Sequence, residues 1–176
     1  MKTSIKREQN DRFLRVDQAG EFGATRIYAG QLAVMGTQGP HARTIAGMAA
    51  HEAEHRRRLD AMLVERGVRP TLLQPLWSAA GFALGAATAL MGPEAAMACT
   101  AAVEQEIDRH YTSQLDALDP ADDPELAQVV EQFRDDERGH RDLALASGAE
   151  KAPGYALLSS VIRLGCRVAI RVSERI

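Results

Sequence analysis

The chain has 176 residues, a length that suits one domain with a single substantial core. Lys and Arg number 21 against 24 Asp and Glu, and the formal net charge of -3 gives no overall reason to expect nucleic acid as a partner. The two cysteines, far apart in sequence, indicate neither a disulfide framework nor a cysteine metal site. We predict one domain over residues 1–176, with residues 1–10 flexible, no secretory signal and a cytoplasmic location by default.

The composition predicts an all-α protein, because aromatic residues are only 5% and no segment alternates apolar and polar residues as an exposed strand would. The first helix should cover about residues 11–34. Gly20, Gly23 and Gly30 interrupt it, and each costs about 1 kcal/mol relative to Ala in a helix interior. We expect them to permit close approach of another helix, although a merely poor helix is the simpler interpretation. A second helix is predicted over about residues 41–66.

Residues 70–93 contain no charged residue, and by length alone this segment could approach a membrane span. Pro75 near the start and many Ala and Gly residues argue against a true span, so we expect a buried or membrane-dipping helix. Gly81, Gly85 and Ala89 recur every four residues and predict a seam of small side chains against another helix.

Two further helices are predicted, over about residues 93–118 and 124–147. Tyr111 lies seven residues after Glu104, on nearly the same helix face, and should either face a site near Glu104 or be an ordinary core tyrosine. Asp135 and Asp136 are either partners that orient a ligand histidine or plain solvated charges.

The last predicted helix, about residues 153–175, places arginines at four-residue steps, at Arg163, Arg167, Arg171 and Arg175. Such a basic amphipathic helix can bind anionic lipid head groups, at about 1 kcal/mol per basic residue near the surface. A solvated face with internal ion pairs is the competing interpretation. Together with residues 70–93, this helix predicts peripheral membrane contact.

Two Glu-x-x-His pairs organise the chain, and each is preceded at a similar distance by one more glutamate. A helix places residues three apart on one face, and this set is the ligand set of a carboxylate-bridged two-metal site in a four-helix bundle. Four converging carboxylates would cost several kcal/mol each, roughly, unless cations compensate. Mixed oxygen and imidazole ligands suit iron or manganese. The predicted metal ligands are Glu21, Glu52, His55, Glu104, Glu137 and His140.

Residues 14–32, which read LRVDQAGEFGATRIYAGQL, closely resemble the opening motif of the demethoxyubiquinone hydroxylase family. Residues 94–104, the Phe-Arg-Asp before the second Glu-x-x-His pair and the final Ser-Glu-Arg-Ile also resemble that family, so the resemblance covers about residues 12–176. The family's iron ligands fall on the same six residues. Gln18 stands where a histidine is expected, and Gly139 replaces a larger residue, but neither is a ligand.

The resemblance implies a ferritin-like four-helix bundle with two additional helices, one uncharged and one basic. It implies two iron ions per chain, O2 as co-substrate and hydroxylation of the ring of a polyprenylated demethoxybenzoquinol. It also implies a peripheral location at the cytoplasmic side of the cell membrane, or at the inner mitochondrial membrane in a eukaryote. Beyond the ligands it implies no catalytic residue, and the electron donor, a homo-oligomer and a complex with other ubiquinone-biosynthesis proteins stay open. The alternatives are a ferroxidase, a peroxide-reducing protein and a non-catalytic membrane-associated scaffold.

Overall fold

A computed structural model describes residues 2–175, and Met1 and Ile176, the ends of the predicted domain, lie outside the described residues. Within residues 2–175 the secondary structure is helical and contains no strand, so the all-α prediction is confirmed. The helices are α1 (Lys2–Met35), α2 (Pro40–Arg66), α3 (Gln74–Leu90), α4 (Pro93–Ala117), α5 (Pro124–Ala146) and α6 (Tyr155–Ser173), with a short 3-10 helix η1 (Ala149–Lys151) before α6.

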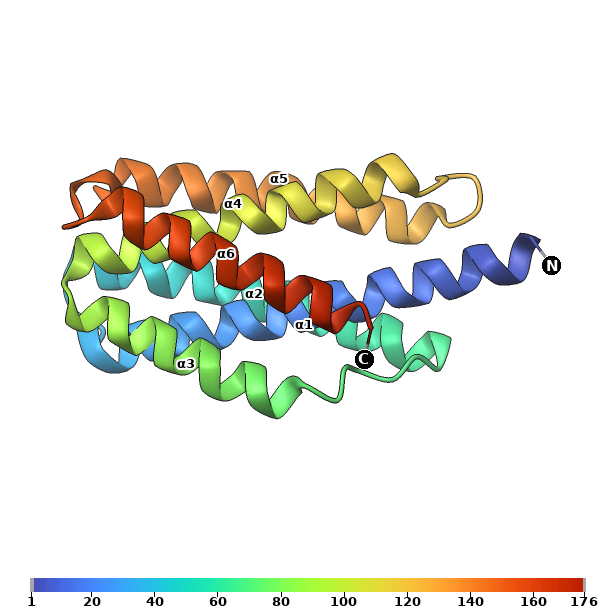
Figure 1. Cartoon of the computed structure of the whole chain (residues 1–176), viewed down its shortest axis with the longest axis horizontal. Coiled ribbons are helices and arrows are strands. Elements are labelled where there is room, and N and C mark those ends of the chain that lie inside the picture. Colours follow the sequence, from blue (N-terminus) through green and yellow to red (C-terminus); the bar gives the residue numbers. More distant parts are fainter. Residues whose placement is uncertain (1, 176) are drawn as a thin grey trace.

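The helices form two antiparallel hairpins with two further helices against them (Figure 1). A short turn joins α1 to α2, and residues 118–123 join α4 to α5, as expected for neighbouring antiparallel helices. The α3 helix packs on α1, and α6 packs on α4. The architecture is therefore the predicted ferritin-like bundle of four helices with two additions.

Proline and glycine explain where several helices begin and end. The α2, α4 and α5 helices each begin with a proline, which has no N–H to lose at the first position of a helix. Gly67 ends α2 in the left-handed region at φ 65°, and its N–H is directed to carbonyl groups of the last turn. The predicted bounds of these three helices are correct to within about two residues.

The first helix starts at Lys2, so the predicted start near residue 11 was wrong. Its extra turns reach the loop between α4 and α5. The Lys6 ammonium group pairs with Asp122 there, and the Asn10 side-chain amide donates to Asp123 at 3.2 Å. These contacts join distant parts of the chain, which a local sequence pattern cannot reveal. The flexibility of residues 1–10 stays a prediction.

Small residues bring α1 and α3 into backbone contact. A Cβ atom at Gly85 would lie 1.9 Å from the carbonyl oxygen of Ile27, and one at Gly30 would lie 2.2 Å from that of Phe82. The predicted seam on α3 is confirmed, and α1 is its partner. At Gly23 the expected close approach is also present, because a Cβ atom at Gly81 of α3 would lie 3.0 Å from the carbonyl oxygen of Gly23. At Gly20 the expectation is wrong, because no atom lies within 4 Å of the corresponding Cβ position.

The uncharged segment does not contain a membrane span. Its helix, α3, has 17 residues, and among residues 2–175 no helix combines the length and the hydropathy needed to cross a bilayer. The prediction that residues 70–93 do not form a true span is therefore confirmed.

The surface that α6 exposes includes a stripe of apolar side chains. Arg167 makes two 2.9 Å hydrogen bonds to the buried carboxylate of Glu106, and Arg163 donates to the side chain of Gln105 at 3.0 Å. Two of the four arginines, Arg163 and Arg167, thus pair with side chains of the bundle, as the competing interpretation of this helix predicts. The apolar stripe of α6, which is 52% to 73% exposed, consists of Leu157, Val161, Leu164 and Val168.

Candidate metal centre

The six predicted ligands converge inside the bundle, one from each of α1 and α4 and two from each of α2 and α5. The glutamates are at most 1% exposed, and His55 and His140 are 4% and 5% exposed. Along α5, the Glu137 and His140 pair lies between Phe133 and Ala144, which belong to two different apolar clusters. Apolar layers therefore enclose the ligands on both sides along the bundle.

The ligand atoms form two overlapping groups, within each of which they lie no more than 4.8 Å apart. Glu52 and Glu137 belong to both groups. The first group adds Glu21 and His55, and the second adds Glu104 and His140. This geometry offers two neighbouring metal positions bridged by two carboxylates, here named the Glu21–His55 position and the Glu104–His140 position.

Buried polar atoms without a hydrogen-bond partner indicate whether this ligand set fits a metal. Almost every buried polar atom in a protein has a hydrogen-bond partner. Here the histidine Nδ1 of His140 lies 2.9 Å from a carboxylate oxygen of Glu52 without forming a hydrogen bond of acceptable geometry. The buried atoms without a partner in the described structure include Oε2 of Glu21 and Glu104, both oxygens of Glu52 and Glu137, and Nδ1 of His55 and His140. Each of the six residues thus offers a free donor atom, so the set fits two cations.

The electrostatics of the cluster favour added positive charge. Burial, followed by repulsion from Glu137, raises the pKa of Glu52 and Glu104 well above the ordinary range. Burial would lower the pKa of His55, but Glu137 and Glu21 outweigh it and raise the pKa to about 10. Burial alone would raise the pKa of Glu137, but the neighbouring His140 and His55 outweigh burial and lower the pKa to about 2. The buried carboxylates thus already favour the positively charged form of His55.

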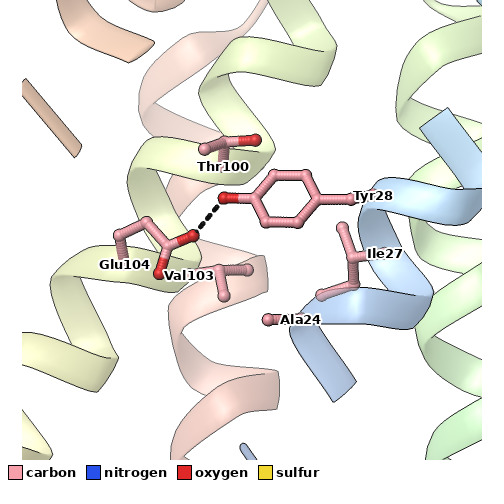
Figure 2. Close-up of a pocket in the computed structure, with 6 residues that line it drawn as sticks. All are labelled: Ala24, Ile27, Tyr28, Thr100, Val103 and Glu104. Atoms are coloured by element: carbon pink, nitrogen blue, oxygen red, sulfur yellow. Dashed lines mark hydrogen bonds between the residues drawn. The ribbon is translucent and has the colours of Figure 1, made fainter. Parts of the chain in front are cut away.

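Two buried tyrosines hold the glutamates of α1 and α4 reciprocally. Tyr28 on α1 donates its hydroxyl hydrogen to Oε1 of Glu104 on α4 (Figure 2), and Tyr111 on α4 donates to Oε1 of Glu21 on α1. In each case Oε2 remains free. Tyr111 therefore lies at the site. The sequence analysis missed Tyr28, although it follows Glu21 by the same seven residues that separate Tyr111 from Glu104.

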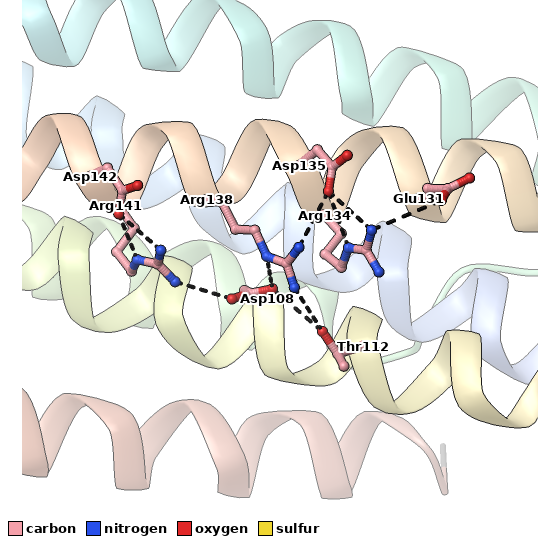
Figure 3. Close-up of polar contacts among 8 residues, drawn as sticks. All are labelled: Asp108, Thr112, Glu131, Arg134, Asp135, Arg138, Arg141 and Asp142. Atoms are coloured by element: carbon pink, nitrogen blue, oxygen red, sulfur yellow. Dashed lines mark hydrogen bonds and ion pairs between the residues drawn. The ribbon is translucent and has the colours of Figure 1, made fainter.

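The outer nitrogens of the two histidines have different partners. Nε2 of His55 lies 3.2 Å from Oδ2 of Asp136, and Nε2 of His140 lies 3.2 Å from Nδ1 of His51. Asp136 thus fits the predicted role of orienting a ligand histidine. Asp135 does not, because it pairs with arginines of its own helix (Figure 3). His51 was not singled out from the sequence.

Two further polar residues, Asp108 and Gln18, join the helices to one another. Asp108, one helical turn after Glu104, accepts hydrogen bonds from Arg138 and Arg141 and so ties α4 to α5 (Figure 3). Gln18 donates to Asp60 at 2.7 Å and accepts from Gln74 at 3.1 Å, which joins α1 to α2 and to the start of α3.

An apolar cavity of about 420 Å³ lies between α1, α3, α4 and α6. Gly20 and Gly23, whose Cβ positions have no atom within 4 Å, line it together with side chains such as Trp77, Leu84 and Ile170. It shares Ala24, Ile27 and Val103 with the narrow pocket that holds Tyr28 and Glu104 (Figure 2). At the surface it includes Val161 of the apolar stripe, which is 60% exposed. The cavity therefore extends from α6 to the neighbourhood of a predicted ligand.

Comparison with known proteins identifies the family. The family model described as ubiquinone biosynthesis protein COQ7 matches residues 8–173. The human NADPH-dependent 3-demethoxyubiquinone 3-hydroxylase, a mitochondrial protein, is 51% identical over 98% of this chain and 81% of its own length. The 3-demethoxyubiquinol 3-hydroxylase of Rhodospirillum rubrum is 51% identical over 94% of this chain and 78% of its own, and the 5-demethoxyubiquinone hydroxylase of Saccharomyces cerevisiae is 42% identical over the same shares. The chain belongs to the COQ7 family of ubiquinone biosynthesis proteins.

Proposed function

We propose that this protein is a di-iron, O2-dependent monooxygenase that hydroxylates the ring of a polyprenylated demethoxybenzoquinol in ubiquinone biosynthesis. The names of relatives about 50% identical to the chain support the reaction. The observation that carries the proposal is the apolar cavity, whose wall residues Ala24, Ile27 and Val103 also border Tyr28 and Glu104. Ferroxidase and peroxide-reducing sites act on small polar substrates and have no use for such a cavity.

The chain's own residues would hold two iron ions in the positions described above. Glu52 and Glu137 would bridge them, and one glutamate and one histidine would complete each position. Bound iron would supply the activation of O2. The apolar layers on either side of the ligands would keep bulk water away from the reacting ring.

The cavity would bind the quinol with its ring toward Glu104 and its tail toward α6. The lining is made almost entirely of apolar and small side chains, which suits an isoprenoid chain. Several of the lining residues are glycines, and they leave room for the substrate where larger side chains would fill it.

A polyprenyl tail partitions into lipid, so we propose that the protein collects its substrate at a membrane surface. The apolar stripe of α6, with exposed apolar residues of α3 such as Leu76 and Phe82, would contact the acyl chains. Val161 belongs to both the stripe and the cavity lining, so a tail could pass between them without crossing water. The membrane would be the cell membrane on its cytoplasmic side or the inner mitochondrial membrane.

The decisive assay incubates iron-loaded protein with a demethoxyquinol and O2 and measures the hydroxylated product. Hydroxylation also consumes two electrons. The assay is run with and without NADPH, because the names of several relatives describe them as NADPH-dependent. We expect product only when O2 and iron are both present, and none from Glu137→Ala. Ferrous or peroxide turnover without ring hydroxylation would contradict the proposal and support the alternative enzymes. A protein that binds no metal would indicate the non-catalytic scaffold.

The role of the cavity is tested by filling it. A Cβ atom at Gly165 would meet no atom within 4 Å, so Gly165→Leu should occupy the cavity without disturbing α6. We expect a raised KM for a long-tailed quinol and a smaller effect on a short-tailed one. Gly47→Leu, on the exposed surface of α2, is the matched control and should change neither KM value.

A further inference from the structure

The two metal positions share two glutamates but differ in the residue that contacts the outer nitrogen of their histidine. His51 and Asp136 each directly precede a bridging glutamate, and each reaches across to the histidine of the opposite helix. The pattern is therefore the same in both halves of the chain, but the residue type is not. His55 has a carboxylate partner, whereas His140 has an imidazole partner.

The other surroundings of the two positions are closely matched. Each terminal glutamate has one oxygen held by a buried tyrosine hydroxyl and the other free. Each position includes the same two bridging carboxylates. The partner of the outer histidine nitrogen is therefore the clearest chemical difference between the positions.

The partner controls how strongly each imidazole binds a cation. A histidine that offers Nδ1 to a metal carries its proton on Nε2. A carboxylate that accepts this proton's hydrogen bond orients the ring and makes the metal-facing nitrogen a stronger donor. A neutral imidazole acceptor does so less, because it carries no negative charge. His55 is further held by the ring of Phe133, stacked with a centroid distance of 3.8 Å, whereas His51 on the other side is exposed.

We propose that the two positions are unequal, and that the Glu21–His55 position binds a divalent metal ion more tightly and fills first. This inference rests on the dinuclear centre proposed above, but not on the reaction that the centre performs. The Glu104–His140 position, next to the pocket shared with the apolar cavity, then holds the more weakly bound ion.

Anaerobic titration of the metal-free protein with Mn2+, followed by electron paramagnetic resonance, tests the proposal. We expect two separable binding steps. Asp136→Asn keeps the size of the side chain but removes its charge, and it should weaken the first step about 10- to 100-fold. His51→Asp supplies the missing carboxylate, and it should strengthen the second step until the two steps approach each other.

Asp135→Asn is the matched control, because Asp135 is an exposed neighbour that pairs with Arg134 and Arg138 instead of His55. Its titration should equal that of the wild type. Anomalous diffraction from crystals with one equivalent of Mn2+ should locate the ion between Glu21 and His55.

Two equal steps in the wild type, or a first ion at the Glu104–His140 position, would overturn the inference. So would an Asp136→Asn titration identical to that of the wild type. Two unequal steps in a protein that fails to hydroxylate the quinol would support the inference while overturning the proposed reaction. Absence of any bound metal would overturn both.

Discussion

Tyr28 and Tyr111 determine how two of the metal ligands present themselves. Each hydroxyl occupies one oxygen of a glutamate on the other hairpin and leaves the second oxygen free for a cation. Both tyrosines are only 1% exposed, so the surrounding packing holds their hydroxyl groups in place. The two glutamates are thereby prepared to bind through one oxygen each.

Removing the Tyr28 hydroxyl should weaken metal binding without unfolding the protein. Tyr28→Phe leaves Oε1 of Glu104 buried without its donor, a loss of about 1–3 kcal/mol in local interactions. We expect metal affinity to fall about 10-fold, as is common when a group that orients a ligand is lost. Tyr155→Phe, half-buried at the start of α6, is the control for losing a phenol hydroxyl elsewhere. Equal affinities for the two variants and the wild type would refute this role.

The sequence predicted the ligand set and offered roles beside it for Tyr111 and Asp136, but it did not reveal Tyr28 or His51. Glu52 and His55 are three apart on one helix, so local spacing is enough to place them together. Tyr28 and Glu104 are 76 residues apart, and His51 and His140 are 89 apart. Contacts across that distance depend on how the hairpins are aligned, which no single-helix pattern contains.

At the scale of helices, Asp123 connects three of them. It caps α5 by accepting a hydrogen bond from the backbone N–H of Leu126, it pairs with Arg66 at the end of α2 at 2.6 Å, and it accepts from Asn10 on α1. Burial raises the pKa of this carboxyl group, but the Arg66 and Leu126 hydrogen bonds outweigh it and lower the pKa below 3.8.

Asp123→Ala should destabilise the protein at neutral pH and not in strong acid. Because the folded-state pKa is lowered, the stabilisation is complete above 3.8 and is lost as the pH falls through the lower folded-state value. We expect a loss of about 1–2 kcal/mol at pH 7, as for other helix caps. Urea unfolding at a series of pH values measures it. Asp122→Ala, which removes only an exposed pair with Lys6, should cost less than about 1 kcal/mol, and a larger cost would argue against the cap as the cause.

The tight contact between α1 and α3 predicts that an alanine at Gly85 lowers the free energy of unfolding. An alanine at a glycine with open space around it should raise this free energy. Gly85→Ala would drive a methyl group into the backbone of α1, so we expect a loss of about 1–3 kcal/mol in the free energy of unfolding. Gly47→Ala, on an exposed part of α2 with open space around it, should gain up to about 1 kcal/mol from helix propensity alone. Thermal unfolding distinguishes the two, and equal shifts would show that the seam is not tightly packed.

The orientation of α6 was harder to predict than its existence. Its arginines recur at regular spacing, but periodicity alone does not say which face meets the bundle. The buried carboxylate of Glu106 on α4 draws Arg167 inward, and the apolar stripe is left exposed. That carboxylate was not recognisable in the sequence as a buried partner, because a lone glutamate next to polar residues usually lies in solvent.

For the whole molecule, the exposed apolar residues of α3 and α6 allow a test of the proposed membrane contact. Leu164→Asp should reduce the binding to anionic vesicles that persists at high salt, because it places a charge where acyl chains would lie. Arg171→Glu should reduce only the binding that salt weakens. Vesicle sedimentation over a salt series measures both. Val64→Asp alters an apolar residue on α2 that is even more exposed than Leu164, and it should have no effect. If all three variants bind like the wild type, the stripe does not face lipid.

The sharing of Glu137 by both ligand groups also sets an order of events during synthesis of the chain. Glu21, Glu52, His55 and Glu104 leave the ribosome first, but neither metal position is complete until α5 follows and folds back along α4. A nascent chain therefore cannot trap iron in a finished position. If the centre holds iron as proposed, both ions would take their final positions only after α5 has packed against α4.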